Sequence, residues 1–166
     1  MKILYLARHA KSDWSNQSIP DFARPLNKRG KRDAPFIGEV LKQKNVHPDL
    51  IISSPAKRAK KTAIAIAKKI DYPEKDILYL EEIYEASSSH LYKVINKLDD
   101  QFNSVMIFGH NPGLTLLNNQ ISDRYIDNIP TCGVVALEID DIWGKISKNN
   151  CKYLYFEYPK LYFNGS

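Results

Sequence analysis

The chain has 166 residues, of which 43% are hydrophobic and 26% charged, a composition typical of a globular protein with a core of its own. It contains no run of about 20 apolar residues that could span a bilayer and no leader-like N-terminal segment, so we expect a cytoplasmic protein with one domain over residues 1–166. The net charge of +5 is uneven, because residues 1–70 carry 16 Lys and Arg against 5 Asp and Glu. This asymmetry predicts an anionic partner, handled mainly by the first half of the chain.

Strand-like and helix-like segments alternate along the chain. The spacing of apolar residues predicts strands at 2–7, 49–54, 77–80, 104–109, 134–139 and 152–158. It predicts helices between them, at 27–44, 55–70, 87–98 and 112–121. Strands that alternate with helices form crossover units, so we expect an α/β fold with a largely parallel sheet covered on both faces. Ligands bind such sheets at the carboxyl ends of the strands.

Three of these strand ends carry arginine and histidine side chains. Arg8 and His9 follow the first strand, Arg58 lies one turn into the helix after the second, and His110 follows the strand at 104–109. Guanidinium groups match the arrangement of phosphate oxygens. An imidazole can act as a nucleophile or a proton donor near neutral pH. The four side chains together predict a phosphate-binding site.

Two helices are expected to begin beside this site. Ser54 is a suitable N-cap with Pro55 as the first helical residue, and Asn111 with Pro112 repeats the arrangement after the strand at 104–109. The unpaired N–H groups of a helix start favour an anion. We therefore expect both helix starts to face the phosphate.

In chain order, these motifs resemble the histidine phosphatase superfamily. The resemblance is carried by RHAKSDW (8–14), SSPAKRAKKTA (53–63) and GHNPG (109–113). Three further segments resemble the small SixA-type phosphohistidine phosphatases within it: DFARPLNKRG (21–30), IYEASSS (83–89) and IPTCG (129–133). The resemblance implies the phosphoglycerate mutase-like fold, a three-layer α/β/α sandwich.

The same resemblance implies a hydrolase in which His9 is the nucleophile. His9 would take up the phosphoryl group as a phosphohistidine that water then hydrolyses, and Arg8, Arg58 and His110 would form the phosphate pocket. Members of the family need neither a metal ion nor an organic cofactor. Phosphoryl transfer depends mainly on positioning and charge stabilisation, which two arginines can provide. Protein phosphohistidine is the substrate we expect, with a small phosphorylated metabolite as the alternative partner.

The general acid is the part of the site that the resemblance determines least. Mutase-like members use a glutamate after the third strand, where this sequence offers Glu81, Glu82 and Glu85. The spacing favours Glu82, Glu85 begins the SixA-like segment, and a solvated turn would explain all three equally well. A phosphoramidate has a more basic leaving group than a phosphate ester, so we expect it to need less help from a protein acid.

Two other classes of function stay open. The fold could serve small phosphate esters as a phosphatase or mutase, or bind phosphate without turnover. No nucleotide-binding loop of the GxxxxGK[ST] type occurs, and no arginine lies six residues after Cys132 or Cys151, which we expect to be reduced thiols. The basic run at 57–61 does not predict nucleic acid, because Arg58 belongs to the phosphate site and the lysines suit the wet side of a helix. We expect no membrane partner either.

The loop before residue 27 contains a further pair of charges. Asp21 and Arg24 stand three residues apart in the segment DFARPL. We expect them to pair with each other and order this loop rather than to contact phosphate.

Overall fold

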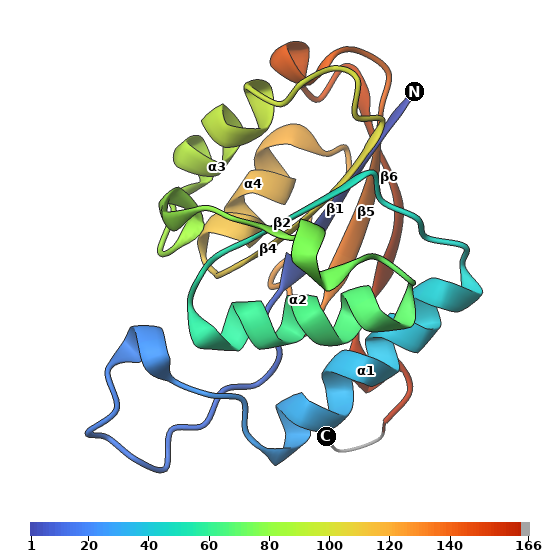
Figure 1. Cartoon of the computed structure of the whole chain (residues 1–166). Coiled ribbons are helices and arrows are strands. Elements are labelled where there is room, and N and C mark those ends of the chain that lie inside the picture. Colours follow the sequence, from blue (N-terminus) through green and yellow to red (C-terminus); the bar gives the residue numbers. More distant parts are fainter. Residues whose placement is uncertain (164–166) are drawn as a thin grey trace.

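The computed structural model describes residues 1–163 and contains a six-stranded sheet between two layers of helices (Figure 1). The strands lie in the order β3–β2–β4–β1–β5–β6. β1 and β2 both pair in parallel with β4, and β3 pairs in parallel with β2, whereas β5 runs antiparallel to both β1 and β6. The strands are β1 (Lys2–Arg8), β2 (Leu50–Ser53), β3 (Leu78–Tyr79), β4 (Ser104–Gly109), β5 (Val134–Ile139) and β6 (Cys151–Glu157).

Each face of the sheet is covered by one pair of helices (Figure 1). α1 (Lys28–Gln43) and α2 (Lys57–Lys69) pack on one face, and α3 (Ser88–Asn96) and α4 (Gly113–Ile121) pack on the other. Because side chains alternate along a strand, β1 contributes Leu4 and Leu6 to the core under α3 and α4, and Tyr5 and Ala7 to the core under α1 and α2. The predicted three-layer α/β/α fold with a largely parallel sheet is confirmed. Short 3₁₀ turns occupy Asp21–Ala23, Glu74–Asp76, Glu81–Ile83, Trp143–Lys145 and Pro159–Leu161.

The first turns of α1 and α3 are each capped by a side chain. Asn27 accepts a hydrogen bond from the Gly30 N–H at 2.8 Å, and Ser87 accepts one from the His90 N–H at 3.2 Å. These bonds satisfy backbone donors that a helix start leaves unpaired. The predicted starts of these two helices therefore agree with the structure to within one residue.

The predicted N-caps of α2 and α4, Ser54 and Asn111, need correction. Ala56, not Ser54, is the N-cap of α2, because the Ser54 hydroxyl accepts from the Ala56 N–H at 3.1 Å in a turn that precedes the helix. Pro112 is the N-cap of α4, although Asn111 Oδ1 still accepts from the Thr115 N–H at 3.2 Å. Ser54 and Asn111 thus accept backbone hydrogen bonds in the turn just before each helix, but neither is the N-cap.

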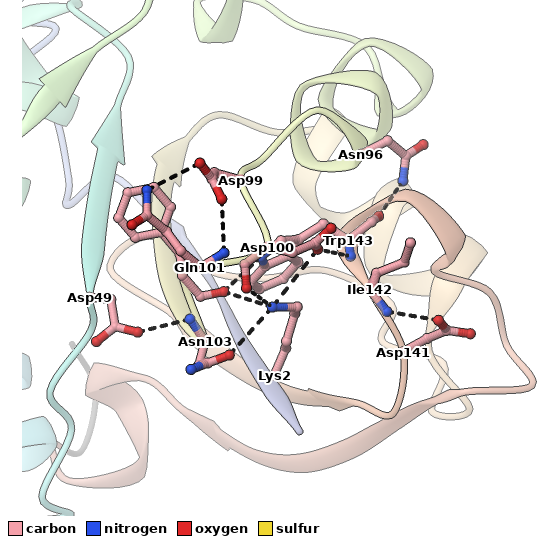
Figure 2. A network of polar contacts seen from close by, with 11 residues as sticks. Lys2, Asp49, Asn96, Asp99, Asp100, Gln101, Asn103, Asp141, Ile142 and Trp143 are labelled. Atoms are coloured by element: carbon pink, nitrogen blue, oxygen red, sulfur yellow. Dashed lines mark hydrogen bonds and ion pairs between the residues drawn. The ribbon is translucent and has the colours of Figure 1, made fainter.

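The amino end of β1 is held by the polar contacts of Lys2 (Figure 2). The side chain of Lys2 is almost fully buried. Lys2 Nζ donates to the carbonyl oxygens of Asp100 at 2.8 Å and Phe102 at 2.9 Å. Trp143 joins the same group, donating from its backbone N to Asp100 Oδ1 at 3.0 Å and from its indole to the Phe102 carbonyl at 2.9 Å. A buried ammonium requires such partners, and they fix β1 at the end opposite to Arg8.

No helix within residues 1–163 is both long and apolar enough to cross a membrane. The cytoplasmic location and the single domain over residues 1–166 stay predictions. Cys132 and Cys151 are both free and buried, as expected of reduced thiols.

Candidate active site

The parallel pairing of β1 with β4 places His9 beside His110. Arg8 lies opposite Gly109 in the register of the two strands, and the His9 N–H donates to the Gly109 carbonyl at 3.2 Å. The two imidazole rings have centroids 5.2 Å apart and planes tilted by 52°. Each of the two residues is only 7% exposed. Two strand ends that are about 100 residues apart in sequence thus supply two adjacent imidazoles.

A hydrogen bond fixes the tautomer of His9. Its Nδ1 lies 2.8 Å from the carbonyl oxygen of Ala10. A carbonyl oxygen can only accept, so Nδ1 carries the proton and Nε2 carries the lone pair. The Ala10 segment is itself held in place, because the Ala10 N–H donates to Thr62 Oγ1 at 2.9 Å and the Thr62 hydroxyl donates to the Arg58 carbonyl at 2.7 Å. No local pattern around Thr62 predicts this role.

His110 is positioned by Ser54 and Tyr84. Its Nε2 forms a 2.8 Å hydrogen bond with the Ser54 hydroxyl, and the edge of the Tyr84 ring packs against the imidazole at a centroid distance of 5.7 Å. Ser54 in turn donates its N–H to the Phe108 carbonyl of β4 at 2.9 Å. The residue expected to cap α2 therefore connects β2 to the histidine at the end of β4.

Arg58 is the second residue of α2, and its guanidinium is held by Asp21. Nη1 donates to the Asp21 carbonyl at 2.7 Å, and Nη2 donates to Asp21 Oδ2 at 3.0 Å. The Tyr84 hydroxyl donates to the same Oδ2 at 2.7 Å. Since a guanidinium has five N–H donors, these two bonds orient Arg58 and leave other donors free for an oxyanion. Neither Asp21 nor Tyr84 was assigned to the site from the sequence.

The expected pair between Asp21 and Arg24 is wrong. Arg24 is buried and donates to backbone carbonyl oxygens of its own loop, those of Asp13, Asn16 and Ile19, at 3.1 to 3.4 Å. Its guanidinium also lies 3.9 Å from the centroid of the Trp14 ring. Arg24 therefore does order the loop, as expected, and the loop presents Asp21 to Arg58.

The environment keeps both histidines neutral. Burial lowers the pKa of His9 to about 3, and the nearby His110, Arg58 and Arg8 act in the same direction. Burial and the charge of Arg58 lower the pKa of His110 to about 4. Both rings are consequently uncharged at neutral pH, which keeps the His9 lone pair available.

Asp21 and Tyr84 keep their ordinary charge states. Burial raises the pKa of the Asp21 carboxyl, but the hydrogen bond from Tyr84 and the charge of Arg58 outweigh it and hold that pKa below its usual value. Burial and the bond to Asp21 raise the pKa of Tyr84 to about 12. Asp21 is thus a carboxylate that pairs with Arg58, and Tyr84 is a neutral donor.

Arg8 lies at the end of β1 against the loop that precedes β5. Its Nη1 donates to the Ile129 carbonyl at 2.9 Å, and its backbone N–H donates to the Gly133 carbonyl at 2.9 Å. Its charge is close enough to lower the pKa of both His9 and His110. The structure thus brings Arg8, Arg58 and the two histidines to one edge of the sheet.

Glu82 has no contact that places it in this group. Glu82 and Glu85 are both exposed, and among residues 1–163 no hydrogen bond or ion pair joins either of them to the two arginines or the two histidines. Glu85 does contribute to raising the pKa of Tyr84. The general-acid role of Glu82 stays a prediction.

The fold and these motifs define a member of a known family. The chain belongs to the histidine phosphatase superfamily (branch 1), whose family model matches residues 4–90. An uncharacterised chloroplast protein of Arabidopsis thaliana is 29% identical over 143 residues, which cover 81% of this chain and 65% of that protein. The chain therefore spans about two thirds of the length of this relative.

Solved structures of SixA proteins have the same fold. A candidate phosphohistidine phosphatase SixA of Agrobacterium tumefaciens has a TM-score of 0.81 and 29% identity, covering 95% of this chain and 98% of that one. A protein histidine phosphatase SixA in complex with tungstate has a TM-score of 0.74 and 17% identity, covering 93% and 95%. The second likeness is one of fold alone.

Proposed function

We propose that this protein is a phosphohistidine phosphatase in which His9 is the nucleophile. The observation that carries the proposal is the hydrogen bond between His9 Nδ1 and the Ala10 carbonyl, because it leaves a neutral Nε2 with a free lone pair. The guanidinium groups of Arg58 and Arg8 lie close enough to this ring to lower its pKa. A nucleophile beside fixed cationic donors is what phosphoryl transfer requires.

The reaction has two steps. His9 Nε2 attacks phosphorus while the bond from phosphorus to the substrate nitrogen breaks, and the substrate imidazole leaves with a proton taken from solvent water. Water then attacks the phosphohistidine, which releases inorganic phosphate and restores His9. Arg8, Arg58 and His110 stabilise the charge on the transferring oxygens in both steps.

Phosphohistidine is favoured over a phosphate ester because, among residues 1–163, no protonated carboxyl group contacts the two histidines. Glu82 and Glu85 are exposed and unconnected to the histidines, and Asp21 is ionised by its contacts with Tyr84 and Arg58. An alcohol leaving group depends on a protein acid more than the basic imidazole of phosphohistidine does. The likeness to the Agrobacterium SixA structure supports the same substrate class.

A substrate panel tests the proposal. We expect a phosphohistidine peptide to be hydrolysed faster than a sugar phosphate or an aryl phosphate at matched concentration. We expect His9→Asn to lose about 1,000-fold or more in kcat/KM, and the exposed His90→Asn to match the wild type. Faster turnover of the sugar phosphate would instead identify a small-ester phosphatase. No turnover of any compound would identify a phosphate-binding module.

A further inference from the structure

A cavity lies beside the proposed phosphate site and shares Arg8 with it. Its volume is about 210 Å³, and none of His9, Arg58 and His110 lines it. Its walls come from the end of β1, the first turns of α1, the loop before β5 and the turn at Pro159–Leu161. The lining residues are Arg8, Arg29, Asp33, Asn128, Pro130, Thr131, Pro159 and Lys160.

Positive charge prevails in this cavity. Arg8, Arg29 and Lys160 face one carboxylate, that of Asp33. Asp33 is bound mainly by Arg32, which lies outside the lining and donates from Nε and Nη2 to Asp33 Oδ1 at 2.9 and 2.8 Å. Arg29 Nε is farther away, at 3.8 Å from Asp33 Oδ2. Asp33 is thus shared between Arg32 and Arg29, and this single carboxylate cannot balance the three positive charges of Arg8, Arg29 and Lys160 that line the cavity.

The two arginines also keep hydrogen-bonding capacity. Arg8 Nη1 donates to the Ile129 carbonyl at 2.9 Å, and Arg29 Nη2 donates to the Thr131 hydroxyl at 3.3 Å. The Nε of each is buried and has no acceptor among residues 1–163. Guanidinium donors in excess, next to a hydroxyl and the amide of Asn128, match a compact oxyanion such as a carboxylate or a phosphate.

The wall of the cavity is fastened to the nucleophile's own backbone. The Cys132 N–H donates to the His9 carbonyl at 2.9 Å, and the Arg8 N–H donates to the Gly133 carbonyl at 2.9 Å. One arginine thus borders both the phosphate site and the cavity. An extended residue spans about 3.5 Å, so an acidic group one or two residues from a phosphorylated side chain can reach it.

We propose that this cavity binds a second oxyanion of the same substrate, held by Arg29 and Lys160 beside Arg8. The proposal rests on the phosphatase function above and adds a determinant of specificity to it. The second oxyanion comes from an acidic side chain that flanks the phosphohistidine, or from a carboxylate on a small substrate. The chemistry of recognition is the same in both cases.

Paired substrates test the proposal. Phosphohistidine peptides with Glu or Gln beside the phosphorylated residue form one pair, and carboxyphenyl phosphate with phenyl phosphate forms the other. We expect the wild type to prefer the acidic member of at least one pair about tenfold in kcat/KM, as one or two charge-assisted hydrogen bonds at a partly exposed site allow. The pair that shows the preference identifies the source of the oxyanion.

Variants connect the preference to the cavity. Arg29→Gln and Lys160→Gln should each reduce the ratio of acidic to neutral kcat/KM to about threefold or less. The matched control is Lys28→Gln, because Lys28 is exposed at the start of the same helix and does not line the cavity; it should keep the wild-type ratio. The proposal is overturned if the wild type shows no preference in either pair, or if both variants keep the full ratio.

A binding measurement separates failure of the cavity from failure of the phosphatase. Malonate should shift the backbone amide resonances of Thr131 and Lys160 in the wild type and not in Lys160→Gln. If malonate shifts these resonances but the protein hydrolyses none of the substrates, the cavity binds anions and the proposed phosphatase function is wrong. If the protein hydrolyses phosphohistidine but shows neither malonate shifts nor a preference for acidic substrates, the phosphatase function stands and the proposed anion site is wrong.

Discussion

At the scale of single residues, the orientation of Arg58 depends on Asp21. The carboxylate and the carbonyl of Asp21 accept from two different nitrogens of the guanidinium, and Tyr84 holds the carboxylate from the other side. The loop that carries Asp21 is ordered in turn by Arg24. The guanidinium of Arg58 is therefore held by a series of contacts and not by its helix alone.

Replacing Asp21 by Ala should lower kcat/KM about tenfold or more, because a misplaced guanidinium stabilises the transferring oxygens less well. Tyr84→Phe should have a smaller effect, since it removes only the bond that holds Asp21. Steady-state kinetics on a phosphohistidine peptide measures both. Asp13→Ala is the matched control, because Asp13 is half-buried in the same loop and its carboxylate forms hydrogen bonds with Ser15 but with no other residue among 1–163. A rise in kcat/KM for Asp21→Ala would mean that Asp21 competes with the substrate for Arg58.

The neutral state of the histidines can be followed directly. Because burial lowers the pKa of His9 to about 3 and that of His110 to about 4, neither ring should titrate in the free protein between about pH 5 and 8. The Cε1–H resonances of the two residues, assigned with His9→Asn and His110→Asn, should stay constant over this range. A midpoint between about pH 6 and 7 for either ring would contradict the buried site.

The sequence predicted which side chains gather but not their partners. Arg8, His9, Arg58 and His110 follow strand ends, and strand ends meet at one edge of a parallel sheet. Asp21 was assigned to Arg24 because the two are neighbours in the chain. Its actual partner, Arg58, lies 37 residues away in the sequence. A contact over this distance cannot be predicted from the spacing of neighbouring residues.

At the scale of elements, α4 is seated closely against the turn that begins α3. A Cβ added to Gly113, the first residue of α4, would collide with the carbonyl oxygen of Ala86. Backbone cannot yield as a flexible side chain can, so α4 would have to move. Because His110 lies three residues before Gly113, that movement would reach the active site.

Gly113→Ala should destabilise the protein by about 1–3 kcal/mol and lower kcat/KM as well. Denaturant unfolding and steady-state kinetics measure the two effects. Gly144→Ala serves as the control, because an added Cβ there would meet its nearest neighbour, the Asn96 carbonyl, at 3.7 Å. If Gly113→Ala has the same free energy of unfolding as the wild type, the backbone at Ala86 can move to accommodate the added methyl group at little cost.

The spacing of apolar residues predicts where the helices and strands lie more accurately than it predicts the residue at which each one begins. The strands at 104–109 and 134–139 agree with the structure residue for residue, because their apolar runs are bounded by polar or glycine residues. The start of α2 was placed two residues too early. Ser54 has the chemistry of an N-cap, yet its hydroxyl bonds His110, and a tertiary partner of this kind is invisible to local pattern.

At the scale of the whole molecule, the buried histidines make folding depend on pH. Above about pH 7 both rings are neutral in the folded and unfolded chains. As the pH falls through 6.5, the ordinary histidine pKa, both histidines become protonated in the unfolded chain. In the folded protein His110 is protonated only at about pH 4 and His9 only at about pH 3. Stability is therefore lost as the pH falls below about 6.5.

Between pH 7 and pH 5 each of these histidines should reduce the free energy of unfolding by about 2 kcal/mol. Urea unfolding at the two pH values measures the difference. In His110→Gln the loss should be smaller than in the wild type by about 2 kcal/mol, and the double variant with His9→Gln should lose less again. Equal losses in all three proteins would show that the folded and unfolded states bind these protons alike.

Trapping the phosphoenzyme shows whether His9 carries the phosphoryl group during turnover. The protein is incubated with radiolabelled phosphoramidate and quenched in parallel in acid and in alkali. We expect a label that survives alkali and is lost in acid, because a phosphoimidazole is stable in alkali and labile in acid. His9→Asn should carry no label. A label that survives acid, or one that persists in His9→Asn, would contradict this role of His9.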